Sequence, residues 1–141
     1  MRFMMLVKAN KESEAGVMPS PELITAMGQF NEEMVKAGVM QAGEGLHPSS
    51  KGTRIRFEKG KRTVTRGPFG HTSELLAGFW IIEVKSEEEA LEWAAKIPFT
   101  EGEEVEIRKI FETADFAGVM SPEEMAREEE LRRELERQAN R

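Results

Sequence analysis

The distribution of apolar and polar residues along the chain separates strand-like segments from helix-like segments. Residues 2–8 and 77–84 are apolar on both faces, which is typical of strands that are covered on both sides of a sheet. Residues 53–58 alternate between apolar and charged side chains, so we expect a half-buried strand there. The sequence predicts strands over residues 2–8, 39–42, 53–58, 61–65, 77–84 and 103–111, with Lys59-Gly60 forming the turn of a hairpin.

Capping residues and helical spacing predict the first helix. Ser20-Pro21-Glu22 combines a hydroxyl cap, a proline in the first turn and a carboxylate near the positive end of the helix dipole. Gly38 is the expected end of this helix, and residues 11–20 before it are expected to form a loop. The buried stripe is predicted to be Leu23, Met27, Phe30 and Met34.

Two further helices follow from the same kind of signal. Ser86 to Glu89 reads as a capping box that begins a helix through residue 96. Ser121-Pro122 begins a highly charged helix toward residue 138, which is either a solvated terminal helix or an arm that crosses to another subunit. The predicted inward residues are Leu91, Ala94 and Ala95 in the second helix, and Met125, Leu131 and Leu135 in the third.

The order of these elements predicts an α+β fold. Its plan is a ferredoxin-like antiparallel sheet with two helices on one face, an inserted β-hairpin and an appended charged C-terminal helix. The strand at residues 77–84 is apolar on both faces, and one helix layer covers only one of them. We therefore expect a homodimer in which a second copy of the sheet covers the other face.

Composition narrows the functional classes. The chain has 141 residues, which suffice for one domain with a core, and the absence of cysteine excludes disulfides and thiolate chemistry. A net charge of -6 argues against a general nucleic-acid-binding protein. The apolar segment at the start is too short to span a membrane, so we expect a cytoplasmic protein without a membrane partner.

Positive charge is concentrated between residues 51 and 66, in and around the predicted hairpin. This segment contains seven basic residues and only one acidic residue, Glu58. Its basic side chains either cover solvated strand faces or form a surface that binds an anionic ligand or an acidic partner.

Several motifs resemble those of the YCII-related (DGPF-domain) family. They are Ala42-Gly43-Glu44-Gly45-Leu46-His47-Pro48-Ser49, the loop Arg66-Gly67-Pro68-Phe69, and Ala90-Leu91-Glu92-Trp93-Ala94. The resemblance covers residues 1–116 and leaves 117–141 as a helical extension of the same domain. It implies membership of the dimeric α+β barrel group.

The chain departs from the family pattern in three places. One is His71, which stands where the family commonly has an acidic residue. Arg66 stands where the family commonly has aspartate, and an arginine cannot accept the turn-forming bonds of a carboxylate. Some relatives are thought to use a His-Asp pair, but residues 8–12 contain no histidine, so that pair is not transferred.

Candidate site residues come from the two motif loops. His47 is the first acid–base candidate, because an imidazole titrates near neutral pH, and Glu44 is its potential partner. A loop histidine that bonds backbone groups and a solvated glutamate are the structural alternatives. The predicted ligand contacts are Arg54, Arg56, Arg66, Phe69 and His71.

Three functional hypotheses remain open. The first is a homodimer that binds a small anionic or aromatic metabolite in a cavity, with general acid–base chemistry of isomerase or lyase type. The second is a non-catalytic binding or regulatory module, and the third is a structural accessory dimer. No cofactor or metal is expected, because the sequence has neither cysteine nor a pair of histidines at ligand spacing.

Overall fold

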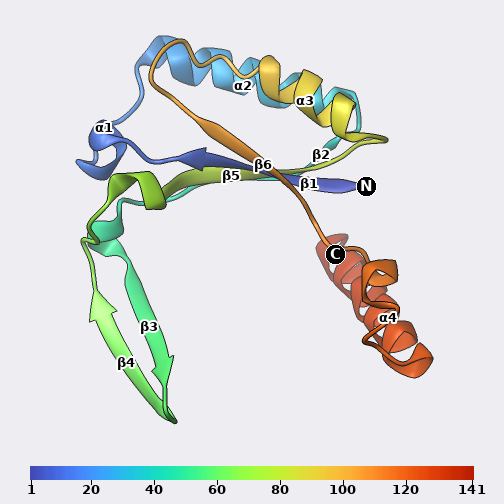
Figure 1. The fold of residues 1–141 in the computed structure, drawn as a ribbon. Coiled ribbons are helices and arrows are strands. Elements are labelled where there is room, and N and C mark those ends of the chain that lie inside the picture. Colours follow the sequence, from blue (N-terminus) through green and yellow to red (C-terminus); the bar gives the residue numbers. More distant parts are fainter. The chain divides into compact units, whose positions relative to one another are not determined.

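The computed structural model describes residues 1–141, which divide into two compact units, Met1–Lys109 and Ile110–Arg141. The first unit contains a four-stranded antiparallel sheet with the strand order β2-β5-β1-β6. Helices α2 and α3 lie on the same face of this sheet (Figure 1). The elements are β1 (Arg2–Lys8), α1 (Lys11–Glu14), α2 (Pro21–Lys36), β2 (Met40–Gly45), β3 (Thr53–Glu58), β4 (Lys61–Arg66), β5 (Leu76–Glu83), α3 (Glu87–Ala95), β6 (Val105–Lys109) and α4 (Pro122–Ala139).

This arrangement confirms the predicted α+β class and is compatible with the ferredoxin-like plan. The predicted bounds of the first strand are confirmed at both ends. The predicted cap of α2 is confirmed as well, because the Ser20 side chain accepts a hydrogen bond from the Leu23 amide. The sheet of a single chain is open, so closure into a barrel requires a second copy.

The core lies between the sheet and the two helices. Met5, Met34 and Ile82 are completely buried there. Trp80 packs edge-to-face against Phe30, with the ring centroids 5.6 Å apart. Burial of these side chains anchors α2 to the central strands β1 and β5.

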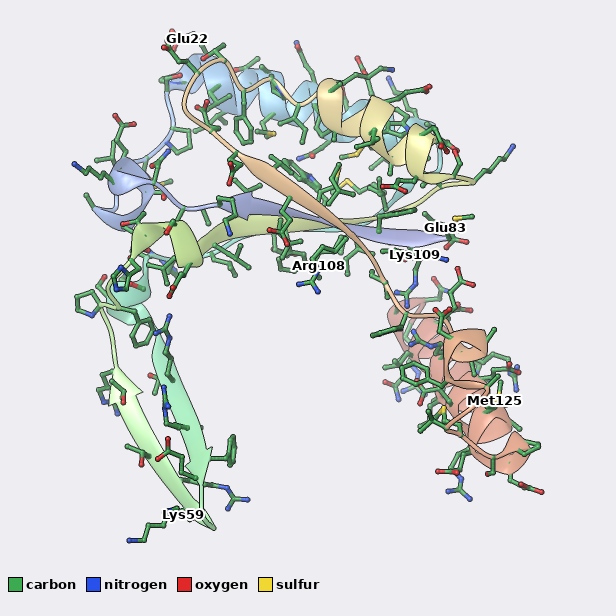
Figure 2. All side chains as sticks on the ribbon, in the orientation of Figure 1. Glu22, Lys59, Glu83, Arg108, Lys109 and Met125 are labelled. Atoms are coloured by element: carbon green, nitrogen blue, oxygen red, sulfur yellow. The ribbon has the colours of Figure 1, made fainter.

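The other face of the central strands is also apolar. Met4 pairs with Ile81 and Leu6 pairs with Phe79, and all four side chains are half-buried. Arg108 of β6, which pairs with Met4, points away from the helices (Figure 2). Within Met1–Lys109, both long helices cover the opposite face (Figure 1), so this open sheet face carries no helix of its own unit.

Two segments differ from the predicted loops because local bonding extends regular structure. Residues 11–20 include α1, which Asn10 caps by accepting a hydrogen bond from the Ser13 amide. Strand β2 continues through Gly43–Gly45, since Glu44 pairs with Phe79 of β5. The second extension brings the glycine-rich motif into the sheet.

The inward face of α3 was predicted one residue out of phase. Leu91 is 51% exposed, whereas Ala90 is fully buried and Trp93 and Ala94 pack against the core. A helix turns about 100° per residue, so a face defined by Ala90, Trp93 and Ala94 excludes Leu91. Ala95 is also exposed, which leaves Ala94 as the correct member of the predicted set.

The β3–β4 hairpin is exposed along its whole length, which contradicts the predicted half-buried strand. Ile55 is 54% exposed and Phe57 is 68% exposed. The alternation was present, but the hairpin extends away from the four-stranded sheet, with Lys59 at its tip (Figure 2). The apolar face of the hairpin therefore has no core to join.

The second unit consists of a short turn of helix at Thr113–Phe116 and the charged helix α4. The predicted helix start at Ser121-Pro122 is confirmed, and Ser121 and Glu124 form a capping box there. Leu131 and Leu135 are mostly exposed, and ion pairs within the helix join Glu130 and Glu134 to Arg133 and Arg137. Neither α4 nor any other helix combines the length and the apolar character that crossing a membrane requires.

We predict that α4 loses helicity in acid. Hydrogen bonds from Arg133 and then Arg137 lower the pKa of Glu130 from its ordinary value of 4.5, and the Ser121 backbone and hydroxyl bonds lower the pKa of Glu124. Groups with a lowered pKa stabilise the folded helix above pH 4.5, and this contribution disappears as the pH falls through the lowered values. Amide NMR shifts of residues 122–139 measured against pH should report the loss.

The matched control for this titration is Glu130→Gln, which should flatten the acid transition because it removes the charged acceptor of both arginines. Unchanged helical shifts of the parent chain down to pH 2 would contradict the role of these ion pairs.

Candidate functional site

The two motif loops meet at the buried side chain of Ser49. Its hydroxyl donates a hydrogen bond to the Glu14 carboxylate, and its backbone amide donates a second one over 2.9 Å. The same hydroxyl accepts a hydrogen bond of 3.0 Å from the Phe69 amide. Ser49 therefore connects the segment after β1, the loop after β2 and the Gly-Pro-Phe loop after β4.

Gly67 fits this junction because it lacks a side chain. A Cβ atom at residue 67 would overlap the carbonyl oxygen of Ser49, while the Gly67 amide donates to the Gly52 carbonyl over 2.9 Å. The Arg54 guanidinium lies 4.0 Å from the centre of the Phe69 ring. These contacts fix the base of the hairpin, so the motif residues Ser49, Gly67 and Phe69 have a structural role.

Both histidines lie on exposed loop backbone near this junction. His47 follows β2 directly, and His71 has a left-handed backbone conformation with φ of 61°. The structure contains no group of three or more His, Cys, Asp or Glu side chains arranged to hold a metal ion. Arg66 ends β4 opposite Thr53.

Three of the predicted ligand contacts border one shallow hollow on the hairpin. Arg54, Arg56 and Phe69 line it together with Ile55 and Thr65, and its volume is about 440 Å³. Arg56 is paired with Glu58 over 3.1 Å, and Arg54 stacks on Phe69. These contacts already engage both guanidinium groups of the hollow.

A second hollow, formed by many more residues, lies between α2, the segment before it, and the β2 and β5 strands. This cleft has a volume of about 520 Å³. Its walls are mainly apolar and include Val7, Met18, Leu23, Ile24, Met27, Trp80 and Phe99. Sites for small molecules are typically clefts of about 300–1,000 Å³ with mainly apolar linings, so this cleft has the size and character of a ligand site.

Glycines on both sides keep the cleft open. Gly28 of α2 and Gly45 of β2 line it, and a Cβ atom on either would meet no other atom within 4 Å. Gly43 is different, because a Cβ atom there would come within 2.7 Å of the Trp80 ring. Gly43 therefore allows Trp80 to lie against β2, while Gly28 and Gly45 leave free volume.

Polar residues interrupt the apolar lining at several points, and two of them have informative surroundings. Asn31 of α2 accepts a hydrogen bond of 2.9 Å from the Trp80 indole nitrogen through its side-chain oxygen. An indole N–H is only a donor, so this bond fixes the orientation of the Asn31 amide. Glu103, in the segment before β6, also lines the cleft, and its Oε2 atom is buried without a hydrogen-bond partner.

The predicted site residues do not meet in this cleft. Glu44 borders it at the β2 edge, but its position opposite Phe79 places its side chain on the open sheet face. His47, His71 and Arg66 are not part of the lining, and neither are Arg54, Arg56 and Phe69. The structure therefore separates both histidines and the hairpin arginines from the cleft, although Gly43, Glu44 and Gly45 of the first motif line it.

Gly28, Asn31 and Glu103 line the cleft but were not among the site residues predicted from the sequence. A signal for Asn31 was present, because it follows Met27 by four residues and so falls on the predicted buried stripe of the helix. A glycine within a predicted helix was a second signal. Glu103 gave no signal, because the turn at Gly102 and the start of β6 determine where its side chain lies.

The fold and the cleft define an α+β protein with a ligand-sized site between its first long helix and its sheet. A family model of the YCII-related domain matches residues 1–114, and the chain belongs to this family. An uncharacterised protein of Rhizobium meliloti (strain 1021) is 32% identical over 68 residues, which is 48% of this chain. The chain spans 55% of the length of that relative.

We predict that Ser49→Ala lowers the free energy of unfolding by about 1–3 kcal/mol, because the Phe69 amide and the Glu14 carboxylate each lose a partner. Ser50→Ala is the matched control, since Ser50 is exposed and should change stability by no more than about 0.5 kcal/mol. Urea denaturation compares the two, and equal midpoints would show that Ser49 does not hold the loops together.

Proposed function

We propose that this protein is a homodimer that binds a small, largely apolar metabolite in the cleft beneath α2. The cleft is the observation that carries the proposal, because it combines an apolar lining with a few fixed polar groups. Trp80 contributes a small accessible part of its indole ring to the lining, since it is 6% exposed, and an aromatic or alicyclic ligand would contact it there. The ligand would enter past Met18 and Ile24, which line the cleft and are mostly exposed.

The open sheet face supports the dimer. Met4, Leu6, Phe79 and Ile81 form a continuous apolar surface by their register across β1 and β5. Charged residues surround it, with Glu44 on β2 and Glu106 and Arg108 on β6. Two such faces related by a two-fold axis would bury their apolar centres and place charges at the rim, which is typical of an isologous interface.

We predict that Leu6→Glu converts the dimer into monomers, because a carboxylate at the centre of the interface would be buried without a partner. Leu91→Glu is the control, since Leu91 is exposed on α3. Sedimentation velocity gives the mass of each. A parent chain that sediments as a monomer would refute the dimer, whatever the variants do.

We predict that Gly28→Leu closes the cleft. The new side chain has free space on the cleft side of α2, and replacing a helical glycine by leucine should not weaken the helix. The probe is 2-phenylethanol, followed by the fluorescence of Trp80 in a Trp93→Phe background. Binding should weaken at least tenfold.

Gln29→Leu is the matched control for the closed cleft. It adds the same side chain to the next residue of α2, which is exposed and does not line the cleft. Equal binding of 2-phenylethanol to the Gly28→Leu and Gln29→Leu proteins would mean that the probe binds elsewhere. No saturable binding to the parent chain would count against a small-molecule site.

Between the two small-molecule hypotheses, the lining of the cleft favours binding without turnover, since it includes no histidine. Acid–base chemistry by His47 and Glu44 stays a prediction. It requires these residues to act at the open sheet face or at the motif loops. If it operates, His47→Ala should abolish turnover of a bound metabolite and leave its affinity within about threefold, because an exposed loop imidazole adds little binding energy.

A further inference from the structure

We propose that the ligand of the cleft carries a protonated amine, and that the Glu103 carboxylate recognises it. This inference rests on the proposed function, because it names the chemical class of ligand for the same cleft. The sequence predicted an anionic or aromatic metabolite, and this inference keeps the apolar ring but makes the ligand a cation. The ligand would combine an apolar body, which packs on Trp80 and Met27, with a single ammonium group.

The Oε2 atom of Glu103 is the first reason. It is buried, and no protein donor reaches it. A carboxylate oxygen that is removed from water without a donor costs free energy, and native structures nearly always supply a partner for such atoms. Because Glu103 lines the cleft, a rotation of its side chain would bring this oxygen to a donor on a bound ligand.

The position of Glu103 is held by backbone structure. The Lys8 amide donates a hydrogen bond of 3.0 Å to the Glu104 carbonyl, which fixes the segment before β6 against the end of β1. Gly102 provides the turn before it, with φ of 86°. The backbone of Glu103 is therefore placed at the cleft before any ligand arrives, and binding would not have to order this segment.

The charges around the cleft favour a cation. The Glu44 side chain lies on the open sheet face, so the other charged residues of the lining are Lys8 and Glu12, and with Glu103 the acidic residues still outnumber the basic one. Lys8 makes no ion pair with any of these carboxylates. An ammonium group would therefore find its counter-charge in Glu103, whereas a carboxylate ligand would meet like charge there.

The experiment compares three probes that share a phenyl ring and a short chain. They are phenethylamine, 2-phenylethanol and 3-phenylpropanoate, which at neutral pH are a cation, a neutral molecule and an anion. Each is titrated into the intact Trp93→Phe chain with the fluorescence of Trp80 as the signal. We expect phenethylamine to bind at least tenfold more tightly than 2-phenylethanol, and 3-phenylpropanoate to bind most weakly.

Two variants assign the preference to one side chain. Glu103→Gln should remove the advantage of the amine and leave the affinity for 2-phenylethanol within about threefold, because the amide keeps the shape and loses the charge. Glu104→Gln is the matched control, since Glu104 is an exposed neighbour outside the lining, and it should keep the amine preference.

The outcomes separate this inference from the proposed function. Equal binding of all three probes, or an amine preference that survives Glu103→Gln, overturns the role of Glu103 and leaves the cleft as a binding site. Tighter binding of 3-phenylpropanoate also overturns it and would point to Lys8. If no probe binds and Gly28→Leu changes nothing, the cleft itself fails as a site, and this inference fails with it.

Discussion

The position of Trp80 is the constraint on which the cleft and its surroundings depend. Its ring lies against β2 only because residue 43 is a glycine, and a Cβ atom there would occupy the space of the indole. The ring packs edge-to-face on Phe30 and donates a hydrogen bond to Asn31, so it connects the sheet to two residues of α2. Since the same ring lines the cleft, the core contact and the candidate ligand surface belong to one side chain.

The closely packed junction around Ser49 and the open volume of the cleft lie in different parts of the molecule. Ser49, Gly67 and Phe69 form a tightly bonded junction at the base of the hairpin, where close packing leaves no room for another side chain. The cleft is bordered by Gly28 and Gly45, which have open space beside them. The replacement of the family aspartate by Arg66 is compatible with this division, because the junction uses Ser49 and the backbone of the loop. The Arg66 side chain is not one of its partners.

Much of the fold could be predicted because its elements carry local signals. The central strands β1 and β5 could be predicted because they are apolar on both faces. Helices α2 and α4 could be predicted from their serine caps. The hairpin shows that a local pattern predicts a strand but does not predict its burial. The alternation around Ile55 and Phe57 predicts a strand, but only the path of the chain decides whether a core lies beside it, and here both are exposed.

The site was harder to predict because it forms from residues far apart in the sequence. Asn31 could be noticed as a polar residue on an apolar stripe, but its bond to Trp80 spans 49 positions of the chain. Glu103 becomes notable only when β6 pairs with β1 and buries one of its oxygens. His47 and His71 were predicted as site residues because of their chemistry and their place in the motif loops, although neither lines the cleft.

A crystallographic fragment screen of the intact chain would test the location of the site most directly. We expect electron density for apolar fragments against Trp80 and beside Gly28, and amine-bearing fragments with their nitrogen at Glu103. Fragments that gather instead around His47 and His71, with an empty cleft beneath α2, would show that the motif loops hold the functional site.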